Sequence, residues 1–325
     1  MDMVRIGVLG TARITKAALI EAARQVPGVA VAAVAARDLP RAQAYALEHG
    51  IAVAYGSYDE LLADSAIDAI YNPLPNSLHG PWTLQAITAG KHVLCEKPFA
   101  SNAAEATLVA EAARSSSLVV MEAMHYRYHP LIRRLNEVVT KLGPVRSMQC
   151  WTSFVIADPG DIRYDYALGG GALMDGGCYA IDCMRMLAGE AEVGGALADT
   201  GSDRLVDRAL AARLSFGDGA TGWFESAFTR SGEFRADLHV TCDGGTVHMD
   251  NFIRPHAGHL EPGGDGSGMA AEAEEPGTWT SYVWQLRAFA EAIRTGSEVE
   301  TSAGNAVATM RVIDAAYRAA GLPTR

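Results

Sequence analysis

Two segments of the sequence place a lysine and a tyrosine where they could handle the proton of an alcohol. Lys97 follows the apolar run His92–Cys95 and precedes a proline. A lysine at the end of a buried strand can hydrogen-bond a hydroxyl group and stabilise the negative charge that develops during its oxidation. Tyr179 lies in a glycine-rich segment. A tyrosine whose pKa is lowered by a nearby ammonium can exchange the hydroxyl proton, so the pair suits interconversion of a carbinol and a carbonyl.

Asp175 lies one helical turn before Tyr179, within a run (169–182) that contains five glycines. On a helix, Asp175, Tyr179 and Asp182 would share one face because their spacing is i, i+4, i+7. The glycines allow the backbone to approach a ligand or another domain closely. Tyrosine and aspartate on a helix are more often ordinary core or surface residues, so this spacing alone does not define a site.

A nucleotide-binding turn is predicted where the apolar run Val4–Leu9 meets a helical segment. A bound phosphate needs a glycine for the tight turn and free N–H groups at the helix N-terminus. The glycine fingerprint is irregular, because Ala12 and Thr15 stand at its second and third positions, and a glycine that merely ends a strand is the alternative. Its place in the first strand-to-helix turn of a βαβ series favours a cofactor site. The predicted contacts are Gly10, Thr11, Ala12, Arg13 and Ile14.

The end of the second predicted strand favours NADP over NAD. An NAD site places an acidic residue there for the ribose 2′-hydroxyl, whereas an NADP site places a small residue and an arginine near the 2′-phosphate. Ala36 followed by Arg37 fits NADP, with Arg41 as a second contact. Asp38 leaves both alternatives open, because it either caps the next helix or supplies the carboxylate of an NAD site.

The elements that position these residues are predicted to form two domains. Residues 1–123 alternate apolar runs with helical segments, which indicates a doubly wound α/β Rossmann domain with a parallel sheet. Residues 124–325 are rich in β runs separated by turn signals, which indicates an α+β domain with an open-faced, mainly antiparallel sheet. Helices are predicted at 179–187, 281–294 and 303–320, with the last two able to pack back on the first domain. The Gly- and Pro-rich residues 257–277 are predicted to form a surface loop.

Composition excludes several classes of function. The formal net charge of −11 disfavours nucleic acid or an anionic membrane as partner, because both require a positive face. The sequence has no apolar run long enough for a membrane span and no signal-peptide pattern, so we expect a cytoplasmic location. Five scattered cysteines without a C-x-x-C pair predict no disulfide framework or zinc site. His125 and His129 have a metal-ligand spacing, but Pro130 argues against a helix there, so no metal is predicted.

The chain resembles the glucose–fructose oxidoreductase/inositol dehydrogenase (Gfo/Idh/MocA) family over nearly its whole length. The resemblance rests on residues 7–14, 68–79, 89–98, 122–130 and 169–179, of which Gly-Lys-His-Val-Leu-Cys-Glu-Lys-Pro (90–98) is the most specific. The family implies a dinucleotide-binding domain followed by an open-faced sheet domain. It also implies a catalytic Lys97, and cofactor contacts at Pro73, Leu74, Asn76, His79, Glu96 and Lys97.

The residue at position 179 distinguishes branches of this family. Inositol-type members carry a histidine there. With Tyr179, the chain is similar to the branch of glucose–fructose oxidoreductase, dimeric dihydrodiol dehydrogenase and NADP-dependent xylose dehydrogenase, whose proposed proton-transfer pair is a lysine and a tyrosine. Arg163 lies in a segment (158–163) that also resembles this branch. The expected substrate contacts are Arg163, Tyr126, Asp175 and Tyr179, of which Asp175 and Tyr179 are also expected in the catalytic centre.

These observations predict hydride transfer between NADP and the carbinol or carbonyl carbon of a sugar or cyclic diol. A homodimer or higher homo-oligomer is expected through the open sheet, whose apolar face would otherwise be exposed. Two alternatives stay open. One is a non-catalytic NADP-binding sensor, because a fold and a cofactor site do not guarantee turnover. The other is a family enzyme that uses the cofactor transiently, as in glycoside cleavage by oxidation and elimination.

Overall fold

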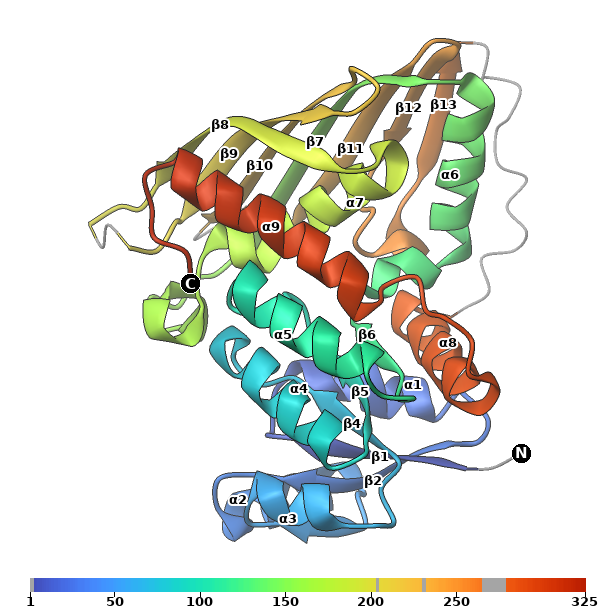
Figure 1. Ribbon diagram of the computed structural model, residues 1–325, viewed down its shortest axis with the longest axis vertical. Helices are drawn as coiled ribbons and strands as arrows, with labels where there is room; N and C mark the ends of the chain where they lie inside the picture. The colour runs from blue at the N-terminus through green and yellow to red at the C-terminus, as the bar shows by residue number, and fades with distance from the viewer. Residues whose placement is uncertain (1–2, 203–204, 230–231, 265–278) are drawn as a thin grey trace. The chain divides into compact units, whose positions relative to one another are not determined.

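The computed structural model describes residues 3–202, 205–229, 232–264 and 279–325 (Figure 1). The chain forms two compact units. The first comprises Met1–His125 and Tyr282–Val307, and the second comprises Tyr126–Ser281 and Ala308–Arg325. Each unit contains one sheet.

The first unit contains a six-stranded parallel sheet in the order β3-β2-β1-β4-β5-β6. Its central strands are apolar at nearly every position, as expected of strands that are covered by helices on both faces. The order reverses beside β1, which defines the doubly wound Rossmann arrangement and confirms the predicted fold class. The strands are β1 (Val4–Leu9), β2 (Val29–Ala35), β3 (Val53–Tyr55), β4 (Ala69–Asn72), β5 (His92–Cys95) and β6 (Val120–Glu122).

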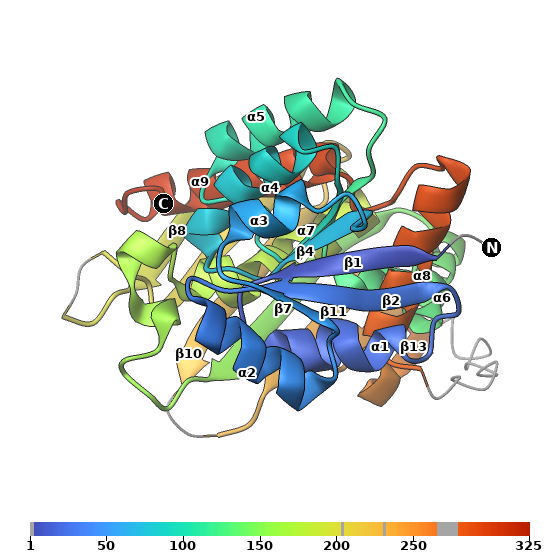
Figure 2. The ribbon, with the colours of Figure 1, turned by 90° about the horizontal axis from the view of Figure 1, so that it is seen from below.

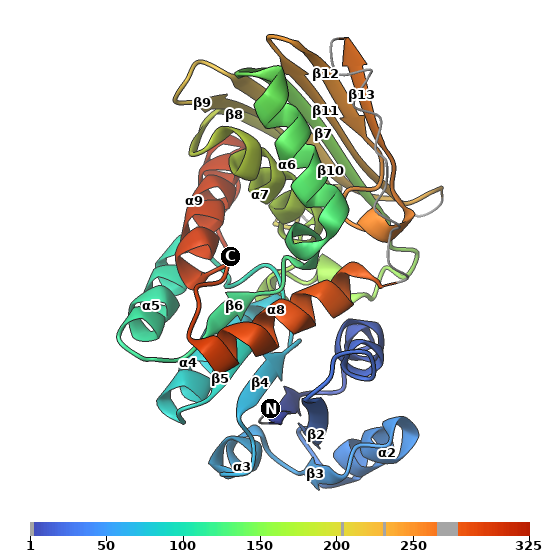
Figure 3. The same cartoon turned by 90° about the vertical axis from the view of Figure 1, so that its right-hand side faces the viewer.

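Helices lie on both faces of this sheet. Figure 2 shows α1 and α2 on one side of the strands, with α3, α4 and α5 on the other. Figure 3 shows α8 in the same unit, where Arg294 donates to the carbonyl of Gly28 at the start of β2. The first helix begins with a wide π-helical turn, Lys16–Ile20, that continues into α1 (Glu21–Ala23). The others are α2 (Leu39–His49), α3 (Tyr58–Ala63), α4 (His79–Thr88), α5 (Ala103–Arg114) and α8 (Ser281–Thr295).

The second unit contains a seven-stranded sheet in the order β13-β12-β11-β7-β10-β9-β8. Neighbouring strands are antiparallel except for β7 and β10, which confirms the predicted mainly antiparallel sheet. Buried and exposed residues alternate along β9 and β11, so the sheet has one core face and one open face. The strands are β7 (Val145–Val155), β8 (Ala191–Asp199), β9 (Ala209–Phe216), β10 (Thr221–Thr229), β11 (Arg235–Cys242), β12 (Gly245–Met249) and β13 (Leu260–Gly264).

Helices α6 (Pro130–Leu142) and α7 (Cys178–Ala188) pack on the core face of this sheet (Figure 3). Helix α6 begins at Pro130, where a proline costs no hydrogen bond, and His129 Nδ1 accepts from the N–H of Leu131. Most of the last helix, α9 (Ala303–Ala319), also belongs to this unit.

The predicted loop at 257–277 is wrong in its first part, because Leu260–Gly264 forms the edge strand β13. Pro262 is compatible with that position, since an edge strand has one side that does not require hydrogen-bond donors. Residues 265–278 lie outside the described chain. Strand β8, which also lies at an edge, and helix α6 were not predicted. Gly194 and Gly195 obscure the β pattern of β8.

Candidate active site

The turn after β1 has the backbone geometry that a nucleotide phosphate requires. Gly10 has φ = +80°, and its N–H donates to the carbonyl of Ala35 over 2.8 Å. The positive φ favours glycine, and a Cβ at this position would lie 3.0 Å from Leu74 Cδ2, so Leu74 would have to move to admit a side chain. Ala12 accepts a hydrogen bond from the N–H of Thr15 over 3.2 Å, which closes the turn without the second and third glycines of the usual fingerprint.

Two arginines gather beside this turn. Arg41 Nε donates to Thr11 Oγ1 over 2.8 Å. Asp38 accepts from the backbone N–H of Arg41 over 2.9 Å, so its carboxylate caps α2. Burial raises the pKa of the Tyr58 hydroxyl, and the positive charges of Arg37 and Arg41 partly oppose this shift, which places all three side chains around one position. We call the positively charged group formed by Arg37 and Arg41 the cationic corner; Asp38 beside it caps α2.

The loop that carries Lys97 is held at the carboxyl edge of the parallel sheet. Glu96 donates its backbone N–H to the carbonyl of Asn72 over 3.0 Å, and its Oε1 accepts from the hydroxyl of Tyr71 over 2.7 Å. Glu122 Oε1 accepts from the N–H of Phe99 over 2.9 Å. These contacts connect the loop to the ends of β4 and β6, so the position of Lys97 is fixed from both sides.

His79 connects the same loop to the one before α4. Its ring is 1% exposed, and its Nδ1 and Nε2 lie 2.7 Å from the carbonyl oxygens of Pro98 and Leu74 respectively. Burial lowers the pKa of His79 to about 4, and the positive charge of Lys97 acts in the same direction. Because both ring nitrogens already contact backbone carbonyls, we infer that His79 orders the loops that carry Leu74 and Lys97.

This environment predicts an acid-sensitive stability. Between pH 6.5 and 4, the histidine of the unfolded chain binds a proton that folded His79 does not bind, so stability falls as the pH falls through this window. The loss should reach about 3 kcal/mol at pH 4. Urea unfolding at several pH values gives the dependence of the free energy of unfolding on pH. In His79→Gln, the slope of this free energy against pH should be smaller than in the wild type by the contribution of one proton. The exposed His259→Gln is the control. A wild-type stability that rises toward acid pH would mean that the two carbonyls hold an imidazolium, which would contradict the prediction.

In the second unit, Arg163 is paired with two carboxylates. Its Nε donates to Asp175 Oδ2 over 2.8 Å, and its Nη1 donates to Asp161 Oδ1 over 3.1 Å. The charge of Asp175, followed by that of Asp161, raises the pKa of the Arg163 guanidinium. The structure therefore brings together Arg163 and Asp175, which the sequence pattern predicted separately, and adds Asp161.

Tyr179 follows a wide turn of helix. The residues Leu173–Gly177 form a π-helical turn that continues directly into α7, so the helix begins earlier than the predicted start at Tyr179. The ring of Tyr179 packs edge-on against Tyr126, with 6.0 Å between the centroids. Tyr126 is fully buried, and its hydroxyl donates to Asp182 Oδ2 over 2.5 Å.

Asp182 thus has partners different from those of Asp175. Arg127 Nη1 also lies 3.3 Å from both oxygens of Asp182. Burial, followed by the charge of Asp182, raises the pKa of the Tyr126 hydroxyl well above its ordinary value. Tyr126 stays a predicted substrate contact, although its hydroxyl donates to Asp182 on the helix that carries Tyr179 and its ring also packs on Phe252.

The predicted site residues divide between the two units. Those predicted to bind the cofactor, together with Lys97, lie in the first unit, and Tyr126, Arg163, Asp175 and Tyr179 lie in the second. Sequence reasoning missed Tyr58, Tyr71 and Asp161. Of these, Tyr71 carried a recognisable signal, because it lies at the carboxyl end of a predicted strand.

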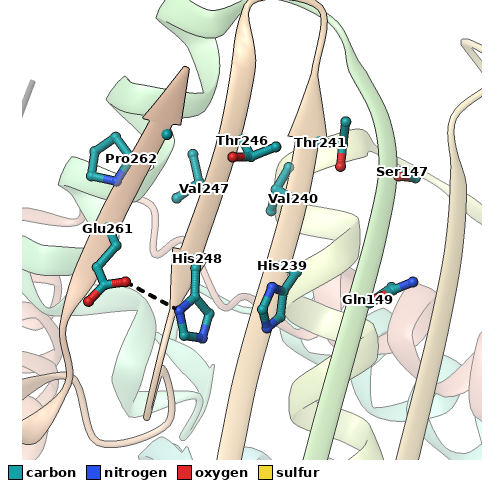
Figure 4. Close-up of a pocket in the computed structure, with 11 residues that line it drawn as sticks. Ser147, Gln149, His239, Val240, Thr241, Thr246, Val247, His248, Glu261 and Pro262 are labelled. Atoms are coloured by element: carbon teal, nitrogen blue, oxygen red, sulfur yellow. Dashed lines mark ion pairs between the residues drawn. The ribbon is translucent and has the colours of Figure 1, made fainter. Parts of the chain in front are cut away.

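The open face of the seven-stranded sheet carries a groove of about 470 Å³ (Figure 4). Gln149, His239, His248 and Glu261 form one row across β7, β11, β12 and β13. The two imidazole rings stack with 4.2 Å between centroids. None of the predicted site residues lines this groove.

Within the described ranges, no three His, Cys, Asp or Glu side chains are grouped as metal ligands. No described helix is long and apolar enough to cross a membrane.

Comparisons with known proteins identify the family. Residues 4–124 match the model of the oxidoreductase family with an NAD-binding Rossmann fold, and residues 132–248 match the GFO/IDH/MocA C-terminal domain. The chain is 39% identical over 318 residues to D-xylose 1-dehydrogenase (NADP(+)) 2 of Haloferax volcanii, covering 97% of this chain and 96% of that protein. The chain belongs to the Gfo/Idh/MocA family, as the sequence motifs indicated.

Two solved structures resemble the chain over 98% of both lengths. One is aldose–aldose oxidoreductase from Caulobacter crescentus complexed with glycerol, with a TM-score of 0.87 and 27% identity. The other is KijD10, a 3-ketoreductase from Actinomadura kijaniata in complex with NADP and TDP-benzene, with a TM-score of 0.84 and 27% identity. Both confirm the fold of a Rossmann unit followed by an open-sheet unit.

Proposed function

We propose that this protein is an NADP-dependent oxidoreductase that transfers a hydride between the nicotinamide and a carbinol or carbonyl carbon of a sugar. The observation that carries the proposal is the position of Lys97. It follows β5 at the carboxyl edge of the parallel sheet, the edge at which β1 ends in the Gly10 turn. Ligands of doubly wound sheets bind at this edge. The names of the relatives, an NADP-dependent xylose dehydrogenase and a ketoreductase complexed with NADP, support the same chemistry.

Bound NADP+ supplies the hydride acceptor, and the chain's own residues must handle the proton. Oxidation of a carbinol releases one hydride and one proton. Lys97, as an ammonium, would hold the substrate oxygen and stabilise its developing charge. Tyr179, as a phenolate, would accept the proton from that oxygen in oxidation, and as a phenol it would return the proton in reduction. Arg163 and Asp175, already paired over 2.8 Å, would exchange part of this contact for hydrogen bonds to other hydroxyl groups.

The cofactor preference follows from the cationic corner. The Arg37 and Arg41 side chains would bind the 2′-phosphate of NADP, while Asp38 is committed to capping α2. The proposal is tested by following reduction of NADP+ and NAD+ at 340 nm with D-xylose, D-glucose, myo-inositol and trans-cyclohexane-1,2-diol. Activity with an aldose, and a preference for NADP+, supports it. Tight NADPH binding without turnover of any compound contradicts it.

We also propose that the open sheet face binds a second copy of the chain. Trp151 and Trp223 lie on this face with 5.4 Å between ring centroids, and Arg235 stacks on Trp151 at 4.5 Å. Both tryptophans are partly exposed, and such an apolar patch is typical of an interface.

Trp223→Glu should dissociate the assembly, because it would bury a charge at the centre of this surface. Light scattering should give the mass of an oligomer for the wild type and that of one chain for the variant. Leu47→Glu, at an exposed position on α2 away from this sheet, is the control. A monomeric wild type at micromolar concentration would contradict the prediction.

A further inference from the structure

A buried ion pair lies behind the glycine turn that precedes the Tyr179 helix. Asp207 lies just before β9, and Arg325 follows α9. Arg325 Nη2 and Asp207 Oδ1 are 2.7 Å apart, and the side chains are 1% and 0% exposed. Both residues belong to the second unit. Figures 1 and 2 both place the carboxyl end of the chain beside the short turns that precede α7.

Asp207 and Arg325 hydrogen-bond the backbone of the turn at three positions, Gly170, Ala172 and Leu173. Arg325 Nε donates to the carbonyl of Gly170 over 2.7 Å. The backbone carbonyl of Asp207 accepts from the N–H of Ala172 over 2.9 Å, and its Oδ2 accepts from the N–H of Leu173 over 2.6 Å. Leu173 is the first residue of the π-helical turn that contains Asp175.

Gly171 is glycine because of this pair. Its φ is +136°, and a Cβ there would lie 2.2 Å from Asp207 Oδ1 and 2.7 Å from the hydroxyl oxygen of Tyr317. Its own N–H donates to the carbonyl of Arg163 over 3.0 Å. Its carbonyl accepts from the N–H of Asp175, also over 3.0 Å. The turn is therefore the junction between the buried pair and the Arg163–Asp175 pair.

Aromatic rings complete the surroundings of the guanidinium. The hydroxyl of Tyr317 donates to Asp207 Oδ1 over 2.8 Å, and the guanidinium carbon of Arg325 lies 4.1 Å from the centroid of the Tyr317 ring. The ring of Tyr166 lies 5.0 Å from the same carbon. Cation–π contacts and the ion pair offset the cost of burying the charge. We call Asp207, Tyr317 and Arg325 the anchor cluster.

We propose that the anchor cluster positions Asp175 and Tyr179 for catalysis by fixing the glycine turn from behind. Its members are positioning residues, because they contact the glycine turn and one another and would act on the reaction through Asp175 and Tyr179. The inference rests on the proposed roles of Asp175 and Tyr179. A buried ion pair contributes little net stability compared with apolar residues of similar size, so a role in geometry accounts for it better than a role in stability.

Arg325→Met should lower kcat for D-xylose and NADP+ by about 10- to 100-fold, because displacement of reacting groups by about 1 Å has effects of this size. The Kd for NADPH should stay within about twofold of the wild-type value, since the cofactor turn belongs to the first unit. Arg318→Met, which removes an exposed arginine from the end of α9, the helix before Arg325, is the control and should leave kcat unchanged. Unchanged kcat in Arg325→Met would overturn the inference.

A second variant separates positioning from stability. Arg325→Met leaves Asp207 buried without its ion-pair partner, so its Tm should fall. Adding Asp207→Asn removes the unpaired charge and should recover part of the Tm, while the carbonyl of Gly170 still lacks its donor. A kcat that stays low in this double variant supports the inference. A kcat that recovers together with the Tm overturns it.

Tyr179→Phe, measured beside these variants, distinguishes failure of the anchor-cluster inference from failure of the proposed role of Tyr179. If Tyr179→Phe loses activity while Arg325→Met keeps it, only the anchor-cluster inference fails. If Tyr179→Phe keeps the wild-type kcat, the proposed role of Tyr179 fails, and the inference fails with it.

Discussion

Replacing Lys97 with methionine should lower kcat by about 10²- to 10⁴-fold, the range observed for removal of a proton-transfer or charge-stabilising group. Methionine keeps an unbranched stem of four heavy atoms but lacks the ammonium that would hydrogen-bond the substrate oxygen. The backbone of the loop should stay in place, because Glu96 and Phe99 are held by Tyr71 and Glu122 through contacts that do not involve the Lys97 side chain. Initial rates at 340 nm and NADPH binding by fluorescence measure the two effects separately.

The matched control is Lys141→Met, which removes an exposed lysine from the last turn of α6 and should not change kcat. A Lys97→Met enzyme with near wild-type kcat would exclude this lysine from the chemical step. A variant that no longer binds NADPH would instead show that Lys97 acts chiefly as a cofactor contact.

Replacing Arg37 and Arg41 together with alanine should raise the KM for NADP+ by about 100-fold and leave the KM for NAD+ nearly unchanged. Each charge-assisted hydrogen bond to a phosphate contributes about 1.5–3 kcal/mol, and NAD+ has no 2′-phosphate to lose. The cap of α2 should survive, because Asp38 accepts from the backbone N–H of residue 41 rather than from its side chain.

Arg24→Ala, which removes an exposed arginine from the end of the first helix, is the control for a general change in charge. Steady-state kinetics with both cofactors give the comparison. An equal rise in both KM values would indicate a damaged Rossmann unit, and no rise in either would place the 2′-phosphate elsewhere. Either result would contradict the assignment.

The local patterns of the sequence predicted the Rossmann unit well because its signals are local. Each parallel strand is a short apolar run followed by a turn. The apolar run that precedes Lys97 is therefore sufficient to place this lysine at the edge of the sheet. The open sheet was predicted less completely. Strand β13 contains Pro262 and two glycines, and its pairing with β12 comes from its position at the sheet edge rather than from its own propensity.

Part of the site could not be predicted, because it depends on residues that are distant in the sequence. The glycines of the run 169–182 were predicted to allow a close approach to a ligand or another domain, whereas Gly171 lies against Asp207. Asp207 and Arg325 lie 36 and 154 residues from Gly171, and no periodicity connects them. The capping role of Asp38 was one of two predicted alternatives, and the hydrogen bond to the N–H of Arg41 places the carboxylate on the helix. The contact of His79 with two carbonyls likewise required the loops of β4 and β5 to be placed together.

The measurement that tests the proposed function most directly is the fate of the carbinol hydrogen. Wild-type enzyme is incubated with NADP+ and D-xylose deuterated at C1, and the reduced cofactor is analysed by mass spectrometry. Direct hydride transfer predicts NADPH that carries one deuterium, formed in equal amount to the oxidised sugar and with a reduced initial rate. Product formation without net reduced cofactor would indicate transient use of NADP, and an absence of both products from a chain that binds NADPH tightly would indicate a sensor. Either outcome would contradict net hydride transfer to NADP+.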